Sequence, residues 1–130
     1  MVSNKYITKR GIIMAIISRF AGPAVLEFRD GVISKFAGRA LYQLRDGVLS
    51  DFAGPAKYQF RDGIISKFAG PALYRFDGQV LSRFAGPALY SLKDNRIDRY
   101  AGPAQYEIRG YLTDEELMAL FVIILEEGII

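Results

Sequence analysis

Apolar and polar residues recur along most of this chain with a period of 16 residues. An aromatic residue followed by Ala-Gly-Pro, or by a close variant of it, marks each copy without an insertion, at Phe20, Phe36, Phe52, Phe68, Phe84 and Tyr100. The units begin at Ile17, Ile33, Leu49, Ile65, Leu81 and Ile97, and their consensus reads ISKFAGPALYQFRDGV. Such a fixed interval indicates a tandem array in which each unit is one supersecondary element.

The second half of the unit has the alternation of a half-buried β-strand, with a period of two residues. In the copy at residues 56–61, the two faces would consist of Ala56, Tyr58 and Phe60 and of Lys57, Gln59 and Arg61. The first half, such as residues 32–36, is β-branched and aromatic, but Ile33 and Phe36 stand three positions apart. A bulge, or a turn that begins at the aromatic residue, would reconcile this spacing with a strand.

Turn-forming residues separate the strands at both ends. Asp-Gly predicts type I′ turns, in which both central residues need positive φ, and the pairs begin at Asp30, Asp46, Asp62 and Asp77. The pair Asp94-Asn95 keeps the same chemistry, because Asn tolerates the left-handed region. Within each unit, Gly-Pro combines a flexible residue with a pre-set φ and predicts a second reversal of the chain.

The pattern predicts a mainly β fold: an antiparallel meander of six 16-residue β-hairpin repeats with one short apolar C-terminal α-helix. We interpret residues 1–130 as a single domain, with an N-terminal cap or degenerate half repeat at 1–16, the hairpins at 17–111 and the helix at 112–130. Tyr6 and Arg10-Gly11 approximate the consensus, so the cap is expected to cover the first strand edge. Aromatic rings of successive units are expected to bury one another, in either a closed ring or an open stack.

A helix signal begins where the repeat ends, after Tyr111. Thr113 and Glu116 form a capping box, and a helix is predicted from about Asp114 to Glu127, ended by Gly128. Its middle, LMALFVIIL, is apolar on every side, so it is expected either inside its own β-array or between protomers. In the second case the oligomer contacts would be Leu117, Leu120, Phe121 and Ile124.

Composition removes most catalytic chemistry from consideration. The 130 residues contain no Cys, His or Trp, and therefore no disulfide, thiolate nucleophile or imidazole base. A serine recurs in most units without a base to activate it, and the turn aspartates do not gather the oxygens of a calcium loop. We therefore predict a protein that is not an enzyme and that needs no cofactor or metal.

Charge and hydropathy are typical of a soluble, cytoplasmic protein. Lys and Arg number 17 against 14 Asp and Glu, for a net charge of +3, and the signs are interleaved. The apolar runs at residues 12–17 and 117–125 are shorter than the ~20 residues that span a bilayer. The first run also lacks the cleavage site of a signal peptide.

The stretch GPALYRFDG at residues 70–78 resembles the short repeats of bacterial beta-flower proteins. Those are compact hairpin assemblies of uncharacterised function, and the resemblance covers Ile17 to about Gly110. It implies a bacterial repeat protein, although six copies here contrast with the fourfold arrangement that the family's name implies. The chain is also similar in outline to MORN and choline-binding repeats, but its unit is shorter and it lacks the Trp of choline-binding boxes.

Two kinds of repeated row are candidate ligand contacts. One row is aromatic and could stack sugars or bases, or could equally belong to the core with its hydroxyls at the edge: Tyr42, Tyr58, Tyr74, Tyr90 and Tyr106. Basic rows could follow phosphates, or could serve local ion pairs and solubility: Arg19, Lys35, Lys67, Arg83 and Arg99, interrupted by Asp51, and Arg29, Arg45, Arg61, Lys93 and Arg109.

The predicted function is a non-catalytic structural or protein-interaction module that can self-associate through its C-terminal helix. The alternative is a glycan- or nucleic-acid-binding module that uses the Tyr and Lys/Arg rows. Interleaved charge makes the nucleic-acid version the less favoured of the two.

Overall fold

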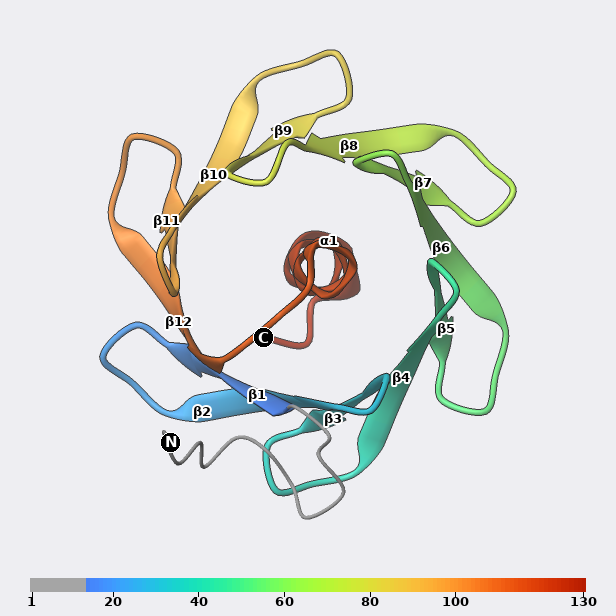
Figure 1. The fold of residues 1–130 in the computed structure, drawn as a ribbon, viewed down its shortest axis with the longest axis horizontal. Helices are drawn as coiled ribbons and strands as arrows, with labels where there is room; N and C mark the ends of the chain where they lie inside the picture. The colour runs from blue at the N-terminus through green and yellow to red at the C-terminus, as the bar shows by residue number, and fades with distance from the viewer. Residues whose placement is uncertain (1–13) are drawn as a thin grey trace, which may run out of the picture.

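The computed structural model describes residues 14–130, which form a closed antiparallel barrel around a central helix (Figure 1). Each strand pairs with the next one in sequence, and β1 pairs with β12, so the meander closes on itself. The predicted hairpin repeats are confirmed, and the array is a ring rather than an open stack. The strands are β1 (Met14–Arg19), β2 (Ala24–Arg29), β3 (Val32–Lys35), β4 (Ala40–Arg45), β5 (Val48–Asp51), β6 (Ala56–Arg61), β7 (Ile64–Lys67), β8 (Ala72–Phe76), β9 (Val80–Arg83), β10 (Ala88–Lys93), β11 (Arg96–Arg99) and β12 (Ala104–Gly110).

The predicted N-terminal cap falls almost wholly on residues 1–13, which lie outside the described residues. β1 itself offers no free edge to cover, because β2 lies on one side of it and β12 on the other.

The structure contains both features that could reconcile the spacing in the first half of the unit with a strand: a bulge, and a turn that begins at the aromatic residue. β3 ends at Lys35 and the turn begins at Phe36. Ile33 lies opposite Tyr42 while Ser34 lies opposite Ala40, so Leu41 is an extra, bulged residue on β4. The same register shift occurs in the other hairpins, and bulges of this kind bend and twist a sheet, as closure into a barrel requires.

A repeated hydrogen bond ties each hairpin to the one before it. The amide of Phe36 donates to the carbonyl of the bulged Val25 at 3.1 Å, and that of Phe52 donates to the carbonyl of Leu41 at 3.0 Å. The amide of Phe20 completes the ring by donating to the carbonyl of Gln105 at 2.9 Å. Successive units therefore share backbone hydrogen bonds beyond the strand ladders.

Three of the Asp-Gly pairs form the predicted turns, with positive φ at both residues: Asp30-Gly31, Asp46-Gly47 and Asp62-Gly63. The prediction for Asp77-Gly78 is wrong. This pair stands one position earlier in its unit, so the central residues are Gly78, at a φ of 100°, and Gln79. A positive φ at the first central residue is typical of a type II′ turn, and the Asp77 carboxylate accepts from the amides of Gln79 and Val80. At Asp94-Asn95, Asp94 has a positive φ, 55°, but Asn95 is not among the described residues with positive φ, so the expectation of a left-handed Asn95 is not met.

The C-terminal helix lies inside the barrel (Figure 1). α1 (Asp114–Val122) starts with the predicted capping box of Thr113 and Glu116, continues into the π-helical turn η1 (Ile123–Glu127) and ends at Gly128, with φ 66°. A helix that is apolar all round fits this position, because the barrel surrounds it with apolar side chains. Of the proposed oligomer contacts, Leu117, Leu120 and Phe121 are buried and Ile124 partly buried within the same chain. We call α1 and η1 together the plug.

Strand side chains meet the plug in layers. Each odd-numbered strand contributes a fully buried aliphatic residue at the same position of the repeat, in the row Ile17, Ile33, Leu49, Ile65, Leu81 and Ile97. Phe121 of the plug is fully buried and packs against Phe76 and Tyr90, with ring centroids 5.3 Å and 6.0 Å apart. The aromatic residues of the strands are buried, but the ring pairs found among the described residues join them to Phe121 of the plug and not to rings of successive units. The aromatic residues of the turns are exposed.

Candidate functional site

The two ends of the barrel differ in shape and chemistry. One end carries the six turns that begin with an aromatic residue and Ala-Gly, five of them followed by Pro and one by Arg39, and these turns project outward in Figure 1. We call this end the rim. The other end carries the Asp-Gly turns and the point at which the chain leaves β12 to enter the barrel, and we call it the entry end.

The rim exposes an aromatic side chain from every hairpin. Phe20, Phe36, Phe52, Phe68, Phe84 and Tyr100 are 43% to 53% exposed, in contrast to the buried Phe residues of the strands. The following Ala of each turn has a φ of 54°. A Cβ at Gly54 would lie 3.0 Å from the Cβ of Asp51, so the turn needs glycine for close approach. Because all six turns share this geometry, the rings are presented in the same way around the barrel.

Basic residues stand immediately before most of the rim turns. Arg19, Lys35, Lys67, Arg83 and Arg99 are exposed there, and Asp51 takes the sixth position. In the strand register, Arg19 lies opposite Tyr106, Lys67 opposite Tyr58, Arg83 opposite Tyr74 and Arg99 opposite Tyr90. The first basic row and the Tyr row therefore meet at the rim, where the cations are exposed and the tyrosines are buried.

The five candidate tyrosines all lie in the interior of the barrel. Tyr42, Tyr58, Tyr74, Tyr90 and Tyr106 are at most 9% exposed and belong to the hydrophobic core. Leu26 is the equivalent residue of the first unit. Their ring faces pack inside the molecule, so they do not form an external stacking platform.

Carboxylates at the end of the plug bind three of these tyrosines. The hydroxyls of Tyr42 and Tyr58 donate to Glu127 at 2.9 Å and 2.7 Å, and that of Tyr74 donates to Glu126. The ammonium group of Lys57 lies 2.6 Å from Glu127 and 3.6 Å from Asp51. The polar cluster therefore anchors the plug to one side of the rim.

The electrostatics of this cluster favour an ionised Glu127. Burial raises the pKa of Glu127, but hydrogen bonds from Lys57, Tyr58 and Tyr42 outweigh it, and the pKa lies below its ordinary value. Burial, with the nearby Glu126, raises the pKa of Tyr74 to about 12. Burial and Glu127 also raise the pKa values of Tyr42 and Tyr58, so the tyrosines stay protonated donors.

One residue of this cluster, Lys57, does not lie on the face of the strand that the alternation of the sequence predicts for it. The pattern puts it on the face opposite Tyr58, but Lys57 is the bulged residue of β6, and both side chains reach Glu127. The signal was present in the repeat, because Val25, Leu41, Leu73 and Leu89 occupy the same position and pack against the core. An apolar residue at this position indicates that the bulge turns its side chain inward.

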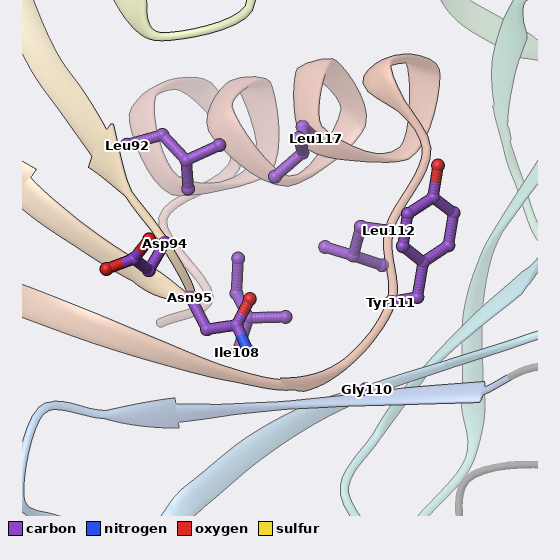
Figure 2. A pocket seen from close by; sticks show the side chains of 8 residues that line it. All are labelled: Leu92, Asp94, Asn95, Ile108, Gly110, Tyr111, Leu112 and Leu117. Carbon is purple, nitrogen blue, oxygen red and sulfur yellow. The ribbon is translucent and has the colours of Figure 1, made fainter. Parts of the chain in front are cut away.

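A separate hollow of about 200 Å³ lies at the entry end (Figure 2). Figure 2 shows Leu92, Leu112 and Leu117 facing a common space, with Asp94 and Asn95 at its edge and Tyr111 on the far side. This volume is below the 300–1,000 Å³ usual for small-molecule sites. We interpret the hollow as the gap left where the chain turns from Gly110 into the barrel.

Neither the residues of the rim nor the hollow suggest a metal centre. Across residues 14–130, no three His, Cys, Asp or Glu side chains gather as metal ligands would. The same stretch contains no helix with the length and apolar character needed to cross a membrane.

No protein-family model matches the chain, and no curated protein or solved structure is significantly similar to it. The resemblance to beta-flower repeats therefore stays a prediction, and the functional argument depends on the geometry of the rim.

Proposed function

We propose that this protein is a non-catalytic interaction module that associates with further copies of itself through its rim. The observation that carries the proposal is the exposure of six aromatic side chains at equivalent positions. Among the other large apolar residues of the described repeats, Tyr111 at the entry end is the one that is also exposed. Exposed apolar patches edged by charge mark interaction sites, and aromatic residues and Arg are enriched in protein interfaces. A closed barrel would present all six turns at little entropic cost, because their positions are already fixed.

The entry end supports another copy as the partner. It carries the turn aspartates, which lie beside the basic residues of the second row, and the exposed Asp114 and Glu115 at the start of the plug. Acidic side chains outnumber basic ones there, whereas cations predominate at the rim. Rim and entry end are opposite ends of one barrel, so the contact would be head to tail and would build chains of molecules.

Sedimentation velocity on paired variants tests this arrangement. The rim variant carries Phe36→Ser, Phe52→Ser and Phe68→Ser, and the entry variant carries Asp46→Asn, Asp62→Asn and Asp114→Asn. Asn is chosen because it tolerates the positive φ of Asp46 and Asp62. We expect the unmodified protein to associate as its concentration rises, and less strongly at high salt.

Each variant alone should be monomeric, whereas an equimolar mixture should form dimers, because one intact rim can still meet one intact entry end. A protein that stays monomeric at all concentrations would contradict the proposal. Association that persists in the rim variant would place the contact elsewhere.

The rival function, glycan or nucleic-acid binding through the Tyr row, has less support. It requires tyrosine faces that a sugar or base can reach, and these rings pack in the core. The exposed cations of the rim still support the nucleic-acid version of that hypothesis. The absence of a gel shift with DNA or RNA at low salt would rule this version out.

A further inference from the structure

The plug uses the ring of tyrosines unevenly. Tyr42, Tyr58 and Tyr74 donate their hydroxyls to Glu126 or Glu127. The hydroxyls of Tyr90 and Tyr106 have no hydrogen-bond partner among residues 14–130. Neither hydroxyl is among the fully buried side-chain polar atoms that lack a partner.

Cations lie beside both unused hydroxyls. Arg99 lies directly opposite Tyr90, and Arg19 directly opposite Tyr106, in the strand register. Side chains at such positions are about 5 Å apart at their Cβ atoms. Both arginines are exposed, and neither forms an ion pair with another described residue.

The charges of this group act on one another. Burial raises the pKa of Tyr90, the charge of Arg99 acts in the opposite direction, and the neighbouring Tyr106 raises it. Tyr90 and Tyr106 lie on β10 and β12, two strands apart, as do Tyr42 and Tyr58 on β4 and β6, whose hydroxyls both reach the carboxylate of Glu127. One small ligand can therefore meet both hydroxyls, with Arg99 on the intervening β11 beside them.

The plug leaves this side of the barrel without an acidic side chain. Glu126 and Glu127 are bound to the tyrosines of β4, β6 and β8. In Figure 1 the C-terminal end of the chain lies on the side of β1 and β12 in projection, and the last two residues, Ile129 and Ile130, are apolar. Tyr42, Tyr58 and Tyr74 thus hold carboxylates on one side of the barrel. On the other side, Tyr90 and Tyr106 occupy the same position of the repeat and have arginines beside them.

We propose that Tyr90, Tyr106, Arg99 and Arg19 form a binding site for the carboxylate of a small organic acid. The protein supplies the precedent, because equivalent tyrosine hydroxyls already donate to the carboxylates of Glu126 and Glu127. Arginine adds paired donors that match the geometry of a carboxylate, and charge-assisted hydrogen bonds are the stronger kind. The site is independent of the rim aromatics on which self-association depends.

Titration with sodium acetate tests the site, with sodium chloride at equal ionic strength as the reference. The protein carries ¹³C-labelled tyrosine, and the ring signals are followed by NMR. We expect saturable shifts at Tyr90 and Tyr106 with acetate, and smaller, linear shifts with chloride. Tyr90→Phe with Tyr106→Phe keeps the packing, removes both hydroxyls and should weaken acetate binding about tenfold. For that variant the protein also carries ¹⁵N-labelled arginine, and the signal of Arg99 reports binding.

Tyr42→Phe is the matched control, because its hydroxyl already serves Glu127. It should leave acetate affinity unchanged, whereas Arg99→Gln should reduce it about tenfold. Equal responses to acetate and chloride, or unchanged affinity in the double variant, would overturn the assignment. Because the three Tyr→Phe substitutions keep every exposed aromatic and charged residue of the rim and of the entry end, their outcome is separate from that of the sedimentation experiment.

Discussion

At the scale of single residues, two charged departures from the repeat consensus lie close together in space. Asp51 stands where the other units carry Lys or Arg, and Lys57 stands where four of them carry Val or Leu. In space, Lys57 lies between Asp51 and Glu127. A barrel of similar units gives the plug several nearly equivalent rotations, and this cluster distinguishes one of them. A buried carboxylate without such partners would be costly, so the three residues act as a set.

Gly63→Val should be strongly destabilising. Gly63 has a φ of 77°, and a Cβ there would lie 2.6 Å from the carbonyl oxygen of Phe76. We expect the free energy of unfolding to fall by about 2 kcal/mol or more, measured by urea denaturation. Gln79 occupies the equivalent position of its own turn, so Gln79→Ala is the control and should change stability by less than about 0.5 kcal/mol. Equal stability of the two variants would contradict the turn assignment.

At the scale of elements, barrel and plug depend on each other. Eight strands enclose a space that side chains alone can fill, and a twelve-stranded barrel is wider. A helix about 10–12 Å across supplies the missing apolar volume. In turn, α1 has 9 residues, too few for stability as an isolated helix in water, so the surrounding strands hold it folded.

Phe121→Ala tests this dependence. Phe121 is fully buried between Phe76 and Tyr90, so its truncation leaves a cavity and should cost about 3–5 kcal/mol. The matched control is Phe52→Ala at the exposed rim, for which we expect a change within about 0.5 kcal/mol. Thermal or urea unfolding measures both. Similar losses from the two variants would mean that the plug does not fill the barrel.

At the scale of the whole molecule, closure distinguishes this protein from an open repeat array. In an open stack the terminal units have a single neighbour and fray first. Here β1 is paired over Ala15 to Arg19 with β12, and the amide of Phe20 donates to Gln105. The first and last hairpins are therefore as fully bonded as those in the middle.

Native-state hydrogen exchange measures the strength of this closure. We expect the amide of Phe20, bonded to Gln105 across the closure, to be protected as well as the amide of Phe52, bonded to Leu41 within the array. The two bonds are chemically equivalent, so each serves as the other's control. Much faster exchange at Phe20 would show that the ring opens at β1 and β12.

The candidate site was predictable in part. The period-2 pattern correctly placed the tyrosines on one face with the strand phenylalanines, because alternation is a local property of an extended chain. It missed Lys57, since a bulge reverses the side at which alternation places a residue. The partners of the tyrosines lie 52 to 85 residues away in sequence, beyond the reach of any local pattern.

The sequence by itself determined the hairpins, most of their turns, the helix and its cap. Each of these depends on dihedral preferences and hydrogen bonds within a few residues. Tertiary structure alone decided that the hairpins close into a ring, that the plug fills it, and that the turn aromatics stay outside. The physical reason is that these features depend on the whole chain at once. Closure requires the curvature that all the bulges produce together, and it requires an interior volume that one apolar helix can fill.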